Sequence, residues 1–439
     1  MFRLLFAAML VTCFLAGSSN AVSYTAGTAT VDVTPTTPIR LSGYGNRTEE
    51  TTDVKQPLFV KALALRAEEG PVALLLTLDN CAINLALSDE VCGRITAKTG
   101  VPRERIAINV SHTHCAPVLT NCIPNIFSKA IPAEHQAHID AYTARVVEAL
   151  VQAAVEAVGA MQPAKLYFGM GSATFGANRR TPGGPSDHDL PVLCVKSPSG
   201  EVRALVAGYA CHCTCLSDNV VNGDWAGFAQ AAMQAAFPGA LGMVSVGCGG
   251  DQNPTPRGTL DHARRYGQEI ADNVKQVVES GMREIDAPLD CALQRVPLAL
   301  DPAPSREEFE TRAKEDTPRG YHARMQLAKL DRGEALRTEI PYTIQSWAFG
   351  DQLAMLFLAG EVVVDYATRF KIEYDRSRLW VSGYSNDVPC YIPSFRIREE
   401  GGYEGADAML YYDQPARFAA DVEERIAAGV HELLPASYK

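Results

Sequence analysis

After residue 21, the sequence has no apolar stretch that reaches the 18 or so residues a membrane-spanning helix requires. It also has no basic excess, because 40 Lys and Arg face 51 Asp and Glu, giving a formal net charge of −11. A nucleic-acid partner would need a basic face, so that class of partner is excluded. Internal repeats and low-complexity linkers are absent too, which makes one folded, soluble domain the simplest organisation.

The N-terminus is the exception to this pattern. Arg3 precedes a short apolar run over 4–17, and Asn20-Ala21 before Val22 forms a small-residue cleavage site. A basic start, a short apolar run and such a site are typical of a secretory signal peptide. We therefore predict a signal peptide at 1–21, a mature domain at 22–439, and a secreted or periplasmic location.

The cysteine spacing does not predict a structural zinc site. Loss of Cys13 with the signal peptide leaves eleven of the twelve cysteines, an odd number whose pairing cannot be derived from sequence. One or two disulfides are compatible with a secreted chain. Cys211, Cys213 and Cys215 alternate along the chain, whereas thiolate zinc sites usually use CxxC spacing. We interpret these three as small strand residues.

Hydrophobic periodicity predicts an α/β fold, with a mixed sheet flanked by helices. Strands are expected at 23–34, 59–66, 72–76, 106–110, 164–169, 205–211, 243–247, 343–349, 353–358 and 379–383. Helices are expected at 87–100 (with Ser88 as N-cap), 133–161, 226–237, 259–280, 363–374 and 415–434. The densely charged segment 302–338 is predicted to be a peripheral helical insertion with a solvated face.

The segment 105–117, RIAINVSHTHCAP, is the most informative part of the chain. A buried strand ends there in two histidines, and sites in open α/β sheets lie just beyond the carboxyl ends of strands. Residues two apart on an extended backbone point to one face, so His112 and His114 can bind one metal together. Alternatively, one binds the metal and the other polarises a substrate. A plain hydrogen-bonded histidine pair is the structural alternative.

Three further strand ends carry residues of the same chemical kind, namely His212, Glu361 and Tyr391. Imidazole and carboxylate are common zinc ligands, and a catalytic zinc site keeps one position open for water. Each residue also has an ordinary structural interpretation. Glu361 can interact with the dipole of the following helix, and Tyr391 can be a half-buried aromatic residue.

The chain resembles the catalytic domain of the neutral (alkaline, non-lysosomal) ceramidase family, from about residue 24 to about residue 412. The motifs that carry the resemblance are AGTATVDVTP, SGYGN, SHTHCAP, NRRTP, GYACHCTC with DWAGFA, GGDQNP, LAGEVV, SNDVPCYI and YEGA. The family consists of zinc-dependent amidases with an α/β fold. The resemblance implies that His112, His212, Glu361 and Tyr391 are ligands of one catalytic Zn²⁺ and that His114 faces the substrate.

The sequence also departs from the family pattern. The family usually has GDVSPN where this chain has Gly250-Asp251-Gln252-Asn253-Pro254, so Asn253 replaces a serine of the family's site. The family's HSGP after the paired histidines is HCAP here, which raises the question of a role for Cys115. We also expect no counterpart of the family's C-terminal immunoglobulin-like domain.

These observations predict a secreted zinc amidohydrolase that cleaves an N-acyl bond with zinc-activated water, with ceramide-like N-acylsphingosine as the first candidate substrate. His114 is expected to contact the substrate oxygen, with Arg180, Asn253 and Tyr403 as further catalytic candidates. Asp79 and Asp251 are candidates for orienting the metal-binding imidazoles, or for capping turns.

Two alternatives stay open. One is a zinc amidase or esterase acting on a non-lipid N-acyl or envelope-derived compound, which predicts no apolar channel leading to His114. The other is a non-catalytic binding module on the same scaffold. A lipid substrate is compatible with transient contact at a membrane surface, and the sequence does not specify an oligomeric state.

Overall fold

The computed structural model describes residues 22–68 and 70–438, so the predicted signal peptide at 1–21 lies outside the described residues. The larger of two main sheets has the order β4-β3-β2-β1-β5-β7-β8-β9, with β11 beside β5. The β3–β4 and β8–β9 pairs are parallel and the others antiparallel, which confirms the predicted mixed sheet. Its strands are β1 (Tyr24–Asp32), β2 (Phe59–Ala67), β3 (Ala73–Leu78), β4 (Ile106–Val110), β5 (Gln162–Ser172), β7 (Asp189–Lys196), β8 (Val202–Tyr209), β9 (Leu241–Val246) and β11 (Arg283–Ile285).

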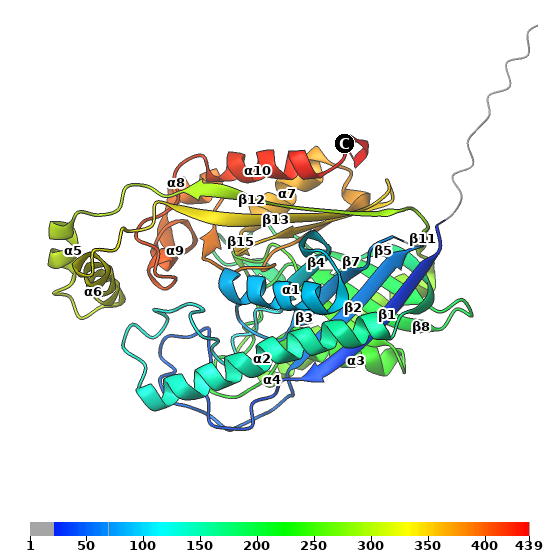
Figure 1. Cartoon of the computed structure of the whole chain (residues 1–439), viewed down its shortest axis with the longest axis horizontal. Coiled ribbons are helices and arrows are strands. Elements are labelled where there is room, and N and C mark those ends of the chain that lie inside the picture. The colour runs from blue at the N-terminus through cyan, green and yellow to red at the C-terminus, as the bar shows by residue number, and fades with distance from the viewer. Residues whose placement is uncertain (1–21, 69, 439) are drawn as a thin grey trace, which may run out of the picture.

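The second sheet lies against the first and has the order β12-β13-β14-β16 (Figure 1). Its strands are β12 (Leu289–Ala299), β13 (Glu339–Phe349), β14 (Leu353–Leu358) and β16 (Leu379–Ser382). Two short strand pairs complete the β structure: β6 (Gly176–Asn178) with β10 (Gln252–Pro254), and β15 (Glu361–Val362) with β17 (Tyr391–Ile392).

Side-chain alternation along the strands explains how the two sheets stack. In β3, Leu74 and Leu76 face the core beneath the helices, while Leu75 belongs to a second core between the sheets. Large aromatic residues of the second sheet, including Trp347 and Phe357, fill that second core. Since successive strand residues point to opposite faces, a strand buried on both sides becomes apolar throughout.

Helices cover the outer faces of the two sheets (Figure 1). The α-helices are α1 (Leu85–Thr99), α2 (Ala133–Gly159), α3 (Asp224–Ala236), α4 (Leu260–Ser280), α5 (Arg306–Arg312), α6 (Pro318–Asp331), α7 (Val364–Glu373), α8 (Phe395–Glu400), α9 (Gly402–Gly405) and α10 (Val422–Leu433). Short 3₁₀ turns occur at η1 (Arg103–Arg105), η2 (Arg376–Arg378), η3 (Asp407–Leu410) and η4 (Ala436–Tyr438). Helices α5 and α6, within the charged segment 302–338, lie at one end of the molecule (Figure 1). None of the helices in the described part of the chain combines the length and apolarity needed to cross a membrane.

Several local expectations differ from the structure. Asn84, not Ser88, caps α1, because its side chain accepts a hydrogen bond from the Leu87 amide while Ser88 lies buried inside the helix. Strands β7 and β12 were not predicted from the sequence. The last helix begins at Val422 instead of residue 415. All eleven cysteines of the described residues are free, so no disulfide forms among them.

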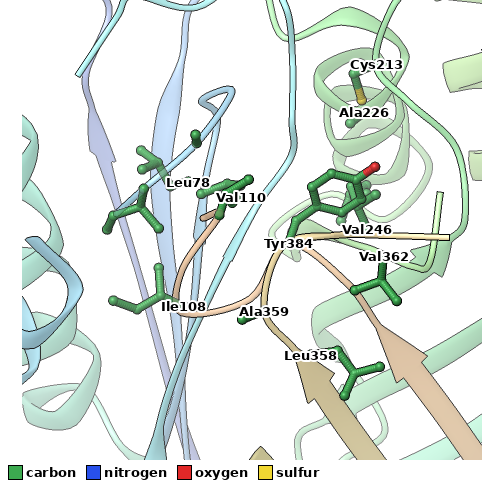
Figure 2. Packing of buried hydrophobic residues seen from close by; sticks show 14 of the residues in the cluster. Leu78, Ile108, Val110, Cys213, Ala226, Val246, Leu358, Ala359, Val362 and Tyr384 are labelled. Carbon is green, nitrogen blue, oxygen red and sulfur yellow. The ribbon is translucent and has the colours of Figure 1, made fainter. Parts of the chain in front are cut away.

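The ends of β4, β9 and β16 meet around one buried asparagine. The Asn109 side chain accepts a hydrogen bond from the Val246 amide (2.9 Å) and donates to the Gly383 carbonyl (2.8 Å). Figure 2 shows buried apolar side chains near Tyr384, among them Val110 of β4 and Val246 of β9. The junction fixes the loops that follow these strands, among them the loop after β4 that carries His112 and His114.

Candidate metal centre and its cavity

His112 and His114 reach the same centre through a turn, not through an extended strand. His112 has a φ of 56°, in the left-handed region that non-glycine residues seldom adopt. The flanking backbone holds this conformation, since the Ser111 amide donates to Leu78 (2.9 Å) and the His114 amide donates to Cys213 (3.2 Å). The expected orientation toward one centre is present, but its geometric cause differs from the predicted strand alternation.

His212, Glu361 and Tyr391 come to this turn from separate strand ends. A parallel bridge between Thr113 and Cys213 sets the two histidine segments side by side. His212 is fixed by its own backbone, whose carbonyl accepts a hydrogen bond from the Trp225 indole at 2.9 Å. Glu361 and Tyr391 are register partners in the parallel β15–β17 pair.

Three electron-pair donors converge at the centre of the site. Glu361 Oε2 lies 3.1 Å from His112 Nε2 and 3.1 Å from His212 Nε2, and all three side chains are buried. The Nδ1 atoms donate to backbone carbonyls, His112 to Cys81 (2.6 Å) and His212 to Gly249 (2.7 Å). These contacts place a proton on each Nδ1, so both Nε2 atoms face Glu361 Oε2 and are able to bind a further proton or a metal ion.

The buried Glu361 carboxylate is stabilised by a positive charge placed between it and the two imidazoles. Glu361 Oε2 is buried and accepts no hydrogen bond from any described residue. Burial opposes protonation of His112, but the Glu361 carboxylate outweighs it and raises the pKa of His112 to about 10. For His212, burial and then Arg179 lower the pKa to about 4. Two imidazole nitrogens and a carboxylate oxygen around one point form a donor set that suits Zn²⁺, so these residues fit a bound metal ion.

A second combination of potential ligands shares His112, namely Cys81, His112 and His114. Here Cys81 Sγ lies 3.8 Å from His112 Nδ1, on the side of the ring whose proton is already donated to the Cys81 carbonyl. The group of His112, His212 and Glu361 therefore presents more available lone pairs to an ion.

Arg179, which the sequence analysis did not select, links the centre to its surroundings. Its guanidinium donates to the Tyr391 hydroxyl (3.0 Å) and to Glu404 Oε1 (2.7 Å), and it lies 3.3 Å from His212 Nε2. The Tyr391 hydroxyl is itself 3.1 Å from His212 Nε2. Burial raises the pKa of Tyr391 well above its usual value, while Arg179 acts in the opposite direction.

Tyr412 is the second residue that the sequence analysis did not find. Its hydroxyl donates a short hydrogen bond to Glu361 Oε1 and thereby leaves Oε2 directed at the two histidines. No strand-end pattern marks Tyr412, because it follows the 3₁₀ turn η3 (Asp407–Leu410). Its only signal in the sequence is its position beside the last motif of the family resemblance.

His114 lies beside the centre, where it borders a cavity. Its Nε2 is 3.0 Å from His112 Nε2, and its Nδ1 has no hydrogen-bond partner among the described residues. The Tyr44 ring contacts it edge-on, with 5.0 Å between centroids. Gly43 makes this close packing feasible, because a Cβ atom there would lie 2.4 Å from His114 Cγ.

The cavity has a volume of about 670 Å³ and contains all four predicted catalytic residues among its walls. Its lining consists of Gly43, Tyr44, His114, Arg179, Arg180, Thr181, Thr214, Asn253, Arg257, Tyr391, Glu400, Tyr403 and Glu404. Arg180 pairs with Glu404 (2.6 Å) and Glu400 (3.1 Å). Asn253 Oδ1 accepts a hydrogen bond from the Thr214 hydroxyl (3.3 Å), and the Tyr403 ring lies 5.3 Å from that of Tyr391.

Asp79 and Asp251 do not orient the imidazoles, because backbone carbonyls have that role. Asp251 instead accepts a hydrogen bond from the Val364 amide at the start of α7 (2.8 Å), the capping role that the sequence left open. Asp79 accepts from the Phe59 amide (3.0 Å). Cys115 Sγ lies 3.9 Å from the Arg47 guanidinium, and burial raises the pKa of the Cys115 thiol to about 12.

Fold and site together define a class: a mixed α/β protein with a buried histidine–carboxylate centre beneath a polar cavity. No protein-family model and no curated protein matches the chain. Solved structures do match its fold. One is the crystal structure of neutral ceramidase from Pseudomonas aeruginosa, with a TM-score of 0.72 and 17% sequence identity. The alignment covers 95% of this chain and 76% of the ceramidase chain. A ceramidase complexed with C2 aligns with 94% and 76%, at 16% identity and a TM-score of 0.72. The predicted resemblance to neutral ceramidase is thus confirmed for the fold.

Proposed function

We propose that this protein is a secreted, zinc-dependent amidohydrolase that cleaves the amide bond of an N-acyl compound. One observation carries the proposal. Three buried lone pairs, from His112, His212 and Glu361, converge beside His114 at the border of a cavity. A donor set of this kind next to a substrate-sized space is the arrangement that hydrolytic zinc sites use.

His112, His212 and Glu361 would hold the zinc ion, with Tyr391 as the fourth ligand that the family resemblance implies. When bound, zinc supplies Lewis acidity, which lowers the pKa of a water molecule to about 7 and polarises a carbonyl group. The surrounding contacts keep the protein ligands in place: the two carbonyls fix the imidazole tautomers, and Tyr412 orients the Glu361 carboxylate.

His114 is the residue best placed to act on the substrate. Burial, together with His112 and His212, holds its pKa well below the usual value, so its imidazole is neutral at physiological pH. A neutral imidazole has one N–H donor and one acceptor nitrogen. It can therefore donate a hydrogen bond to the amide oxygen or accept a proton at Nδ1, which is unpaired.

The other cavity residues would position the substrate. Arg179 holds the Tyr391 hydroxyl beside His212, and Arg180 is held in turn by Glu404 and Glu400. Asn253 and Tyr403 present an amide and a phenol to the same space. These groups supply hydrogen-bond donors for the oxygen that gains charge as the amide bond is attacked.

The names of the fold neighbours make a ceramide-like amide the first substrate of known chemistry to test. The polar walls of the cavity favour the second candidate from the sequence, a non-lipid N-acyl compound. Both candidates share the reaction, in which water adds to the acyl carbon, the carbon–nitrogen bond breaks, and a carboxylic acid and an amine are released.

Metal content and acyl release test the proposal together. The chain 22–439 would be compared with His112→Ala and with a surface control, His431→Ala, which removes an imidazole that forms an ion pair with Glu373 away from the candidate site. We expect about one equivalent of zinc and amide hydrolysis in the wild type and the control, and loss of both in His112→Ala. Full zinc occupancy in His112→Ala would contradict the ligand assignment.

The substrate panel for this test contains N-acylsphingosine and hydrophilic N-acetyl compounds. A zinc-loaded wild type that hydrolyses none of them would contradict the proposed reaction. Glu361→Ala separates the binding-module alternative, which predicts that this variant keeps full function.

A further inference from the structure

Polar and charged side chains form most of the cavity walls. Among the described residues that line it there is no Ala, Val, Leu, Ile, Met or Phe. Ion-paired side chains (Arg179 and Arg180 with Glu404) and tyrosine hydroxyls take their place. Laying an alkyl chain against these groups would remove charged side chains from water without offering them hydrogen bonds, which is unfavourable. The space suits hydroxyl-bearing and charged groups instead.

Arg257 gives the cavity an uncompensated positive charge. Arg179 and Arg180 are both neutralised by glutamates, but Arg257 forms no hydrogen bond or ion pair with any residue of 22–68 or 70–438. Its guanidinium is exposed and lies close enough to Tyr44 to counteract part of the burial-driven rise in the pKa of that phenol. Since Tyr44 contacts His114, an anion bound by Arg257 would lie on the same side of the site as His114.

A second, much smaller space adjoins the cavity at His112 and Glu361. A hollow of about 20 Å³ is bounded by Cys81, His112, Ile123, Ile126, Glu361, Tyr411 and Tyr412, and it shares Gly43, His114, Tyr391 and Tyr403 with the lining of the cavity. That volume accommodates about one water molecule. Ile123 and Ile126 are the aliphatic residues of its described lining, and its size matches a methyl group and not a long chain.

Resting on the proposed function, we propose that the substrate is an N-acetyl-sized amide of a hydrophilic amine that carries a carboxylate. The acyl methyl occupies the hollow beside Ile123 and Ile126, the hydroxyl-bearing amine portion fills the polar cavity, and its carboxylate pairs with Arg257. An N-acetylated sugar acid and an N-acetylamino acid share this chemistry. Tyr403 is 42% exposed, so its aromatic side chain is accessible for a sugar ring to stack on.

The test compares substrates in pairs on zinc-loaded protein. N-acetylmuramate and N-acetylaspartate carry the carboxylate, N-acetylglucosamine is the neutral counterpart, and N-palmitoylsphingosine in mixed micelles represents the lipid. The variant is Arg257→Gln, and the matched control is Arg264→Gln, which replaces another exposed arginine outside the cavity. We expect Arg257→Gln to lower kcat/KM about tenfold for a carboxylate substrate through KM, and to leave the neutral amide unchanged.

The outcomes separate this inference from the proposed reaction. Hydrolysis of one carboxylate compound and not the other supports the inference and identifies the sugar or the amino acid as the source. Faster hydrolysis of N-palmitoylsphingosine than of every polar amide overturns the inference and leaves the proposed reaction intact. If no amide is hydrolysed, equilibrium binding decides. Equal affinity of wild type and Arg257→Gln for N-acetylmuramate overturns the inference, and weaker binding by the variant supports it.

Discussion

Removing one hydroxyl group, in Tyr412→Phe, tests how the centre is built. The Tyr412 hydroxyl donates to Glu361 Oε1, and both side chains are buried. Without this donor, the carboxylate loses the only hydrogen bond that the described residues give it, and Oε2 is no longer held toward His112 and His212. The substitution keeps the aromatic ring, so packing around the site is preserved.

The expected effect follows from the kind of contact that is lost. A hydrogen bond to a charged group contributes about 1.5–3 kcal/mol, and groups that orient metal ligands typically affect metal affinity about 10- to 100-fold. The two ranges agree, since a factor of ten corresponds to about 1.4 kcal/mol. We therefore expect Tyr412→Phe to raise the Kd for zinc about 10- to 100-fold.

Competition with a zinc chelator of known affinity measures this change, with the fold checked by circular dichroism. Tyr411→Phe is the matched control, because its hydroxyl is adjacent in sequence, borders the same small hollow and forms no hydrogen bond with any described residue. Its Kd should equal that of the wild type. An unchanged Kd in Tyr412→Phe, or an equal rise in Tyr411→Phe, would refute the reasoning.

Two further predictions concern the cavity wall and the pH dependence of stability. In Gly43→Ala the new Cβ would lie 2.4 Å from His114 Cγ and displace the imidazole, so amide hydrolysis should fall at least about tenfold at full zinc occupancy. The control is Gly200→Ala, which also has a positive φ but lies in open space and should keep full activity. Burial raises the pKa of Asp387 from 3.8 to about 7, so the folded state holds a proton that the unfolded chain releases. The free energy of unfolding should therefore fall by a few kcal/mol as the pH rises from about 4 to about 7. Urea titrations of Asp387→Asn should show no such fall in the free energy of unfolding. An equal fall in the wild type and in Asp387→Asn would contradict the assignment of the pH dependence to Asp387.

The elements that sequence predicted well are those whose local pattern and tertiary environment agree. Strand β4, Ile106–Val110, is apolar at every position but Asn109 because it is buried on both faces. Strand β12 was missed because it is polar at many positions and contains Pro297. Its place at the edge of the second sheet explains why proline and polar side chains are tolerated there.

The residues of the candidate site also differ in whether a local sequence pattern marks them. Residue type and strand-end position made His112, His212, Glu361 and Tyr391 candidates, and the family resemblance implied that they act as one set. The structure brings them together. Arg179 differs from Arg180 only by one position in the NRRTP motif, and the direction of each side chain depends on the β6–β10 pairing. Tyr412 contacts Glu361 across 51 positions of sequence, a distance over which no periodicity operates.

The central claim is that His112, His212 and Glu361 bind one metal ion. Anomalous X-ray diffraction from crystals of the chain 22–439, recorded on both sides of the zinc absorption edge, tests it most directly. The account predicts one strong zinc peak within bonding distance of His112 Nε2, His212 Nε2 and Glu361 Oε2. No peak there in crystals grown with zinc, or a peak beside Cys81 instead, would contradict it.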